Sequence, residues 1–218
     1  WGMTTRLIGA IIMVHGDERG LVLPPKVAPI QVIIVPIAIH KEGVVDKARE
    51  VYQKIAAAGI RVELDDRDTQ SPGWKFNEWE LKGVPLRLEI GPRDIENNQV
   101  VLVRRDNFEK KFVPMDNMIQ AIQDLLVEVH DGVYQKALKM RENYTSVARD
   151  FDEFKEIMKE KEGFVKAMWC GARECEDNIK AETGATSRCI PFEQEHLADN
   201  CVYCGKPAKH MVYFAKAY

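Results

Sequence analysis

Residues 71–94 read SPGWKFNEWELKGVPLRLEIGPRD, a stretch that contains signals for a helix, a strand and two turns. Ser71 is a good N-cap, and Pro72 suits the first helical turn because its missing N–H would have no partner there. Gly83 is typical of the residue just after a helix end. We therefore predict a helix between Ser71 and Gly83. The residues that recur at helical spacing within it are Trp74, Glu78 and Leu81.

A strand follows this helix over residues 84–90. Its apolar and charged side chains alternate, which is typical of a strand with one buried and one solvent-exposed face. Gly91 and Pro92 end the strand, and we expect them to present Arg93 and Asp94 on a loop. The side chains predicted to be buried are Leu86, Leu88 and Ile90, and those predicted to be exposed are Arg87 and Glu89.

Further strands and helices alternate on both sides of this stretch. We predict strands where β-branched residues cluster, and helices where apolar residues recur every three or four positions. Such alternation indicates an α/β domain in which helices pack on a mixed sheet. The predicted strands are residues 31–39, 60–64, 99–104 and 110–113, and the predicted helices are residues 44–58 and 115–129.

The first 28 residues are apolar and interrupted by glycines. We predict a strand end at residues 3–6, a buried helix at residues 7–14 that stops at Gly16, and a short strand at residues 21–23. Arg6 stands at the start of the apolar segment. A local cap or ion pair is the simplest role for Arg6 from the residues alone.

The chain becomes more polar after Gly132, and we predict a boundary near residue 135 followed by an α+β domain. The residues at the C-terminal end are too apolar for a frayed tail, which indicates an edge strand. The predicted elements are helices at residues 133–147 and 150–161, and strands at residues 164–169 and 211–215.

The composition limits the possible partners. The 218 residues carry a net charge of −3, so any contact with RNA needs a local basic patch on an acidic surface. The longest apolar run, residues 8–14, is far shorter than the ~20 residues that a membrane-spanning helix needs. We recognise no secretory signal, and the first residue, Trp1, suggests a fragment. We expect a cytoplasmic protein with no membrane partner.

All five cysteines lie between residues 170 and 204. Without a secretory signal, such clustering favours a metal site over disulfides. Cys201 and Cys204 have the spacing of a zinc-binding turn, and Cys170 and Cys175 are slightly further apart. Four thiolates would complete a tetrahedral structural site. The alternatives are that Cys189 or His210 is a ligand, or that no metal binds.

Four segments carry the pattern of a known family: DDRD at 65–68, PGWKF at 72–76, EWELKGVP at 78–85 and GPRD at 91–94. They resemble the anticodon-binding domain of prolyl-tRNA synthetases of the archaeal and eukaryotic kind. The resemblance extends over the whole chain, and a pattern of this length is highly specific.

The resemblance implies an ATP contact near the N-terminus. Residues 1–9, WGMTTRLIG, resemble the third signature motif of class II synthetases, so Arg6 would be a catalytic residue that contacts ATP, and Thr4 a second contact. A guanidinium can stack on adenine and neutralise phosphate oxygens. The first and second motifs are absent. The parts implied are a catalytic-domain strip at 1–28, an anticodon-binding domain at 29–134 and a zinc-binding domain at 135–218.

The resemblance also implies roles near the C-terminus. The structural zinc ion of the family would be held by four of the five cysteines, and Cys189 would be a spare buried thiol. Tyr218 would dock back toward the catalytic domain. The implied zinc ligands are Cys170, Cys175, Cys201 and Cys204.

Interleaved charges in the central stretch suit the recognition of an anticodon. Unpaired bases are recognised by hydrogen bonds to their edges, beside basic groups that contact phosphates. We expect Trp74, Phe76 and Trp79 to belong to the core, because aromatic residues at helical spacing are usually packed. The candidate RNA-binding residues are Arg67, Lys75, Glu80, Lys82 and Arg93.

These features predict the C-terminal part of a prolyl-tRNA synthetase, which activates proline with ATP and Mg²⁺ and charges tRNA(Pro). No nucleophilic catalytic group is evident, which fits a reaction that depends on positioning and on neutralising phosphate charge. We expect a homodimer formed through the catalytic domain, and an inactive fragment in isolation. The alternatives are a stand-alone RNA-binding module and a zinc-ribbon interaction domain, neither of which needs an ATP-site arginine.

Overall fold

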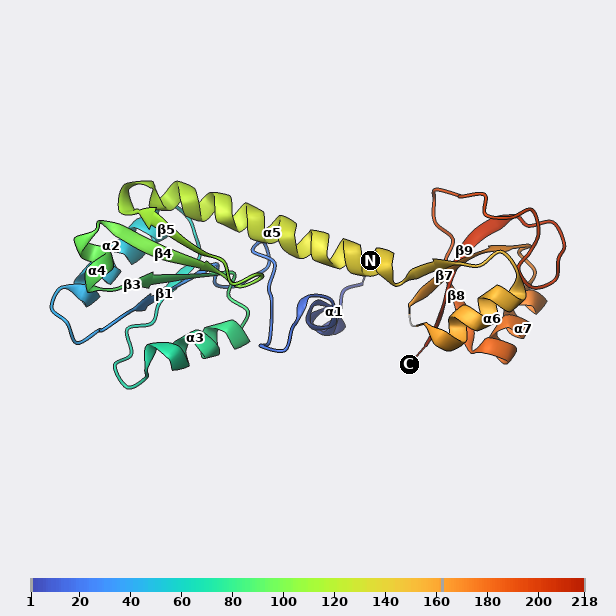
Figure 1. Ribbon diagram of the computed structural model, residues 1–218, viewed down its shortest axis with the longest axis horizontal. Coiled ribbons are helices and arrows are strands. Elements are labelled where there is room, and N and C mark those ends of the chain that lie inside the picture. The colour runs from blue at the N-terminus through green and yellow to red at the C-terminus, as the bar shows by residue number, and fades with distance from the viewer. Residues whose placement is uncertain (1, 162, 218) are drawn as a thin grey trace. The chain divides into compact units, whose positions relative to one another are not determined.

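A computed structural model describes residues 2–161 and 163–217 (Figure 1). The chain divides into two compact units, of which the first extends to Ala137 and the second begins at Leu138. The structure describes one β-sheet in each unit. No helix in the described ranges is long and apolar enough to cross a membrane.

The first unit contains a five-stranded mixed sheet, as predicted. Its strand order is β2-β1-β3-β4-β5. β1 pairs in parallel with both β2 and β3, whereas β4 is antiparallel to β3 and to β5. β1 is fully buried because strands flank it on both sides and helices cover both of its faces. The strands are β1 (Val32–Pro36), β2 (Val62–Leu64), β3 (Leu86–Ile90), β4 (Gln99–Arg104) and β5 (Lys110–Pro114).

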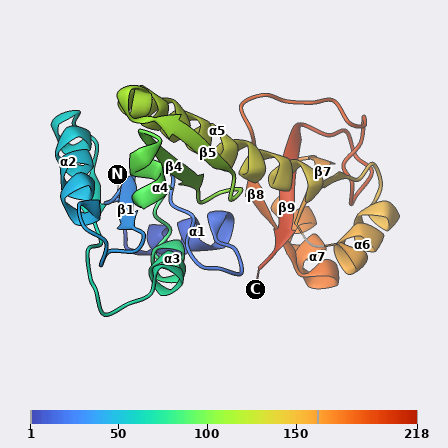
Figure 2. The same cartoon turned by 60° about the vertical axis from the view of Figure 1, so that its left-hand side comes forward.

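Helices cover the two faces of this sheet unequally (Figures 1 and 2). α2 (Val44–Ala57) and α5 (Met118–Asn143), which follows the 3-10 turn Met115–Asn117, bury the larger core on one face. α3 (Pro72–Leu81) packs on the other face, over β1, where Trp79 and Phe76 contact Ile33 and Val35. Trp74 is 45% exposed, so its predicted place in the core is wrong.

The local signals around α3 act as predicted. The Ser71 hydroxyl accepts a hydrogen bond from the Trp74 N–H at 3.3 Å, and Pro72 is the first helical residue. Gly83 follows with a φ of +73°, a left-handed conformation that suits glycine. The residues after Gly91 do not form the expected loop. They form a short helix, α4 (Pro92–Glu96), because the Asp94 carboxylate accepts from the Gly91 N–H at 2.9 Å.

β3 is not half-buried. Its apolar residues are fully buried, but Arg87 is also only 9% exposed. The prediction failed because Phe76 of α3 stacks on the Arg87 guanidinium and because two carboxylates hold it. Arg87 Nη1 is 2.7 Å from Glu80 Oε1, and Arg87 Nε is 3.0 Å from Glu89 Oε1.

α5 continues through Gly132, so the predicted break into two helices is wrong. A Cβ at Gly132 would lie 2.8 Å from Asp106 Oδ2 and 3.2 Å from Arg104 Nη2. The lack of a side chain at Gly132 therefore lets the Arg104–Asp106 ion pair pack against α5. The glycine does not end the helix.

The N-terminal segment also differs from expectation. α1 (Arg6–His15) stops before Gly16 as predicted, but it begins at Arg6, residues 3–5 form no strand, and none of the helix residues is buried. Residues 21–23 do not join the sheet. The Leu21 N–H donates to Leu81 O at 3.0 Å and the Leu23 N–H to Gly83 O at 3.2 Å, so this segment runs beside the end of α3.

The second unit has a four-stranded sheet of order β6-β7-β9-β8, with α6 and α7 packed on one face. β9 lies between β7 and β8, so the predicted edge strand at the end of the chain is wrong. Tyr218 is outside the described residues. The elements are β6 (Thr145–Val147), α6 (Phe151–Glu160), β7 (Phe164–Trp169), α7 (Arg173–Thr183), β8 (Ala185–Cys189) and β9 (His210–Lys216).

A buried carboxylate anchors α3 to the sheet. Asp65, just after β2, has a side chain that is 1% exposed. It accepts from Trp79 Nε1 at 2.7 Å and from Arg67 Nε at 2.8 Å, and the ammonium of Lys75 lies 3.4 Å from Oδ1. Burial alone would raise the pKa of Asp65, but hydrogen bonds from Arg67 and Trp79 and the charge of Lys75 hold it well below its usual range.

We predict that Asp65→Asn destabilises the protein by about 3–5 kcal/mol at neutral pH, because Lys75 would be left buried without its counter-charge. A carboxylate with a lowered folded-state pKa stabilises the fold above its unfolded-state pKa of about 4, and this stabilisation disappears as the pH falls. The variant should therefore lose less stability on acidification than the unsubstituted chain. Urea unfolding at pH 7 and pH 3 measures both effects.

Asp66→Asn is the matched control. Asp66 is 41% exposed and pairs with Arg49 at the surface, so its loss should cost less than about 1 kcal/mol. Equal losses for the two variants would contradict the anchoring role of Asp65.

Candidate metal centre and candidate nucleic-acid interface

Four cysteine sulfurs converge in the second unit. The Sγ atoms of Cys170, Cys175, Cys201 and Cys204 all lie within 4.8 Å of one another. Cys170 Sγ is 3.6 Å from Cys175 Sγ and 3.8 Å from Cys204 Sγ. Disulfide sulfurs would be about 2.05 Å apart. Four thiolates about 2.3 Å from one zinc ion would be about 3.8 Å from one another, so the observed spacing fits a tetrahedral metal site.

Separate elements supply the two cysteine pairs. Cys170 directly follows β7, and Cys175 lies in the first turn of α7. Cys201 and Cys204 lie in a loop that is closed by a backbone hydrogen bond from Cys201 N–H to Lys206 O at 2.7 Å. Gly205 has a φ of +69°, which lets the loop turn back behind Cys204.

Electrostatics in the cluster favour a bound cation. Burial and the neighbouring thiols raise the pKa of Cys175, and burial raises the pKa of Cys201. The N–H of Lys206 donates to the sulfur of Cys204 and lowers its pKa to about 7. Buried thiolates without a counter-charge are unfavourable relative to neutral thiols. A bound divalent cation would supply the counter-charge and stabilise the thiolates.

The other candidate ligands lie outside this cluster. Cys189, at the end of β8, is exposed, so its predicted role as a buried thiol is wrong. His210 begins β9 and is not part of the sulfur cluster either. The four-cysteine set that the resemblance implied is therefore the one that the described residues bring together.

The predicted RNA-binding residues do not form one cluster. Lys75 must be corrected, because its side chain is only 2% exposed and its ammonium donates to Asp65 O at 2.9 Å. It is a structural cation. Arg93 is exposed on α4, which packs with α2 on the sheet face opposite α3. It is therefore separated by the sheet from the candidates on α3.

Arg67 and Lys82 do lie together along α3. Both contact Glu78, with Arg67 Nη2 at 2.5 Å and Lys82 Nζ at 2.8 Å from its carboxylate oxygens. Their side chains are 42% and 49% exposed. The Lys82 ammonium also lies 4.1 Å from the centre of the Trp79 ring. These two cations can reach solvent and any ligand that approaches α3.

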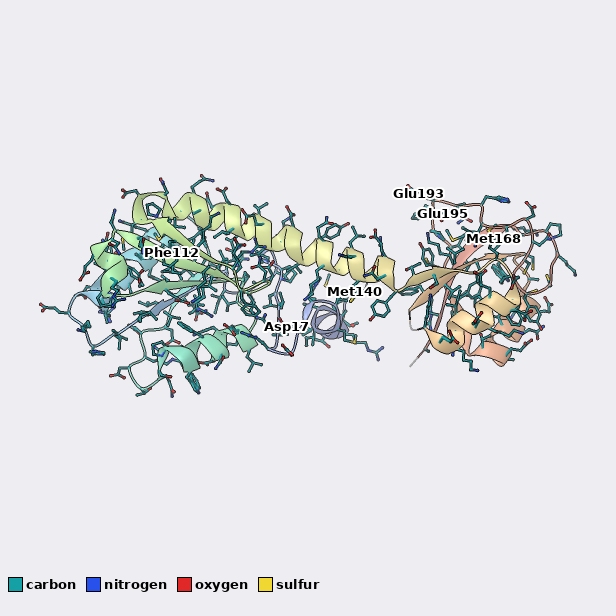
Figure 3. All side chains as sticks on the ribbon, viewed as in Figure 1. Asp17, Phe112, Met140, Met168, Glu193 and Glu195 are labelled. Atoms are coloured by element: carbon teal, nitrogen blue, oxygen red, sulfur yellow. The ribbon has the colours of Figure 1, made fainter. Side chains whose placement is uncertain are left out.

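A second surface lies where α3 leaves the outer half of the sheet open. On this face, Glu89, Val101 and Phe112 form one cross-strand row, and Arg87, Val103 and Lys110 form the next. We call this surface, with Glu80 of α3, the open sheet face. Phe112, which Figure 3 marks on β5, is 64% exposed and Lys110 is also exposed, whereas Arg87, Val101 and Val103 are buried.

Charges of opposite sign alternate across the open sheet face. Arg87 bridges Glu80 and Glu89, and Lys110 Nζ lies 3.9 Å from Glu89 Oε2. The Arg87 guanidinium stacks 3.9 Å from the centre of the Phe76 ring. An exposed aromatic ring beside paired acidic and basic groups can stack a base and bond its edge.

Sequence reasoning missed most of this surface. It selected Glu80, which is 11% exposed, but not Arg87, Glu89, Lys110 or Phe112. The strand alternation that it recognised in β3 contained the signal, because Arg87 and Glu89 were assigned to the face opposite the apolar core. The same alternation in β5 places Lys110 and Phe112 on that face.

Arg6 and Thr4 stand at the start of α1. The Arg6 N–H donates to the Thr4 hydroxyl at 3.3 Å, and both residues are exposed. The Arg6 guanidinium is in none of the ion pairs identified among the described residues. Trp1, the first residue of the supposed third motif, lies outside the described residues.

Two families match this chain. The family described as "Anticodon binding domain" matches residues 31–125, which include the whole five-stranded sheet. The family described as "Prolyl-tRNA synthetase, C-terminal" matches residues 151–218, which include all four clustered cysteines.

Relatives match the chain over its full length. It is 62% identical to a proline-tRNA ligase of Alkaliphilus oremlandii, 61% identical to one of Clostridium novyi and 57% identical to proline-tRNA ligase 2 of Clostridioides difficile. All of this chain is covered, and 45% of each relative. The chain thus spans about half the length of the curated relatives it matches. It belongs to the prolyl-tRNA synthetase family and is the C-terminal part of such a protein, with its anticodon-binding domain.

Proposed function

We propose that the whole protein is a cytoplasmic, homodimeric prolyl-tRNA synthetase that activates proline with ATP and Mg²⁺ and transfers it to tRNA(Pro). The observation that carries this proposal is the 57–62% identity to proline-tRNA ligases over the full length of the chain. Within it, residues 1–28 belong to the catalytic domain, 29–134 bind the anticodon and 135–218 form the zinc-binding domain. A stand-alone RNA-binding module is not favoured, because the full-length relatives are ligases.

The proposed reaction needs charge neutralisation more than a protein nucleophile. A proline carboxylate oxygen attacks the α-phosphate of ATP, and pyrophosphate leaves; the ribose of the tRNA terminus then takes the prolyl group and releases AMP. Arg6 contacts the nucleotide with its guanidinium, and the Thr4 hydroxyl is a second contact. The exposed position of both at the start of α1 supports these roles. Hydrogen-bond donors and positive charge placed beside the phosphates stabilise the charge that develops there.

We predict that Arg6→Ala in the full-length protein lowers proline-dependent exchange between ATP and pyrophosphate by about 10²-fold or more. Arg49→Ala is the control, because Arg49 is an exposed arginine of α2 with a surface ion pair. A full exchange rate in the Arg6 variant would contradict the assigned ATP contact.

We further propose that the anticodon lies against the open sheet face, with the cations of α3 beside it. Phe112 offers a ring for stacking, and Lys110 and Lys82 offer charge for phosphates. Arg67 lies on the same side of the sheet and is a proposed RNA contact there. Arg93, which is exposed on the other side, is also a proposed RNA contact. Lys75 is not a proposed RNA contact, because its side chain is buried.

We predict two separable effects on binding of tRNA(Pro). Phe112→Ala should weaken binding by about 1–3 kcal/mol with an unchanged salt dependence, because a stacking surface is lost. Lys110→Gln should lower the slope of log K against log[salt] by about 0.7, because one phosphate contact is lost. Binding titrations at several salt concentrations measure both.

Lys54→Gln is the matched control for the lysine variant. Lys54 is 55% exposed and Lys110 is 56% exposed, and each pairs with a glutamate. Lys54 lies on α2, on the opposite face of the sheet. An equal effect of the two lysine variants would exclude the open sheet face as a specific phosphate contact.

We propose that the four-cysteine cluster holds a structural zinc ion. Four sulfur ligands and tetrahedral spacing are typical of Zn²⁺. The cluster joins β7, α7 and the loop at residues 199–207, so the ion would tie these three pieces together. The closed ligand set leaves no position for a substrate.

We predict about one zinc ion per chain by elemental analysis of natively purified protein. Cys175→Ser should abolish it and unfold the second unit, while the first unit keeps its hydrogen-exchange protection. Cys189→Ser should retain the metal. Native protein that lacks zinc would contradict the proposal.

A further inference from the structure

Residues 17–23, which we call the connecting segment, lie unusually close to the end of α3. A Cβ at Gly83 would be 2.5 Å from the Leu21 Cβ, and a Cβ at Gly20 would be 2.7 Å from the Leu81 Cα. Both glycines have positive φ angles. Together with the two backbone hydrogen bonds at Leu21 and Leu23, this contact fixes the segment that joins α1 to the sheet.

A buried ion pair holds the same segment from the side of the sheet. Arg105 follows β4, and its side chain is 2% exposed. Its Nη1 and Nη2 atoms donate to the two Asp17 carboxylate oxygens at 2.7 and 2.6 Å, and its Nε donates to Glu80 O at 2.9 Å. Figure 3 marks Asp17 between α1 and α3. A bidentate pair of this kind fixes orientation as well as distance.

The ion pair connects two regions with different proposed roles. Asp17 lies two residues after the end of α1, which begins at Arg6. On the other side, Glu80 of the open sheet face is held through its backbone by Arg105 and through its carboxylate by Arg19 at 3.4 Å and Arg87 at 2.7 Å. The hydrogen bonds from Arg105 also hold the pKa of Asp17 below its usual range, so Asp17 is charged at neutral pH.

We propose that the Asp17–Arg105 pair is a positioning element that orients the ATP-binding strip relative to the anticodon-binding surface, and that it serves tRNA charging and not proline activation. This inference rests on the proposed function. In the proposed function, proline activation takes place at the ATP site and does not involve the anticodon-binding surface. Charging requires one tRNA to reach both regions at once, and its rate therefore depends on how rigidly they are oriented.

The test compares two reactions of the full-length protein that carries Asp17→Asn. The substitution keeps the shape of the side chain and removes the negative charge that pairs with Arg105. Proline-dependent exchange of ATP and pyrophosphate should remain within about twofold, whereas kcat/KM for charging of tRNA(Pro) should fall about tenfold, the scale of coupling between distant sites. Hydrogen exchange at the Leu21 and Leu23 amides should become faster.

Asp106→Asn is the matched control. Arg104 also donates two hydrogen bonds to one carboxylate, from Nε and Nη2 to Asp106 at 3.0 and 2.8 Å, but this pair packs against α5 and does not touch the connecting segment. It should leave the ratio of charging to exchange unchanged. Arg105→Lys keeps the positive charge but loses the pair of guanidinium N–H donors. It should shift the ratio of charging to exchange in the same direction as Asp17→Asn.

An equal fall in charging and exchange in the Asp17 variant would overturn the inference, because a general loss of stability would explain it. Unchanged charging, or the same shift in the Asp106 variant, would also overturn it. If Asp17→Asn does not fold, the Arg105→Lys ratio decides. An unsubstituted protein that shows neither exchange nor charging would refute the proposed function itself.

Discussion

The arrangement of the first unit depends on one buried carboxylate. Asp65 is held by Trp79, Lys75 and Arg67, and α3 cannot move along the sheet without leaving a buried charge unpaired. Because α3 is fixed over β1, the outer strands keep an open face, and the end of the helix is available to the connecting segment. The candidate RNA surface and the link to α1 therefore both follow from this anchor.

Local signals in the sequence were sufficient for the element types of α3 and β3 but not for the burial of their residues. The N-cap at Ser71 and the alternation of β3 act through neighbouring residues, so they could be recognised in the sequence. Burial of Arg87 depends on Phe76 and Glu80 of α3, which reach it only because the helix lies over the sheet, and on Glu89 of its own strand, so the alternation of β3 alone does not report it. Gly132 is a second example. A glycine stands there because a Cβ would lie too close to the ion pair between Arg104 of β4 and Asp106 in the turn after it, and the residues around Gly132 do not reveal that pair.

The metal centre was easier to predict than the RNA surface for a chemical reason. Thiolates have few roles in a chain of this kind, so clustered cysteines with knuckle spacing indicate a metal site, and the four sulfurs do converge. Lysine has many roles. Lys75 and Lys110 look alike in sequence, yet one neutralises a buried carboxylate and the other extends from an exposed strand edge. Only the positions of their partners distinguish them.

The paired charges of the open sheet face bear on how an acidic chain could bind RNA as we propose. Phosphates would be repelled by Glu80 and Glu89, but the amino groups of bases can donate to carboxylates. The cations nearest to solvent, Lys82 and Lys110, are the ones available to phosphates. A strand of unpaired bases would therefore be favoured only with its base edges toward the glutamates and its backbone toward the lysines. Such a surface gains selectivity from its negative charges at the expense of non-specific affinity.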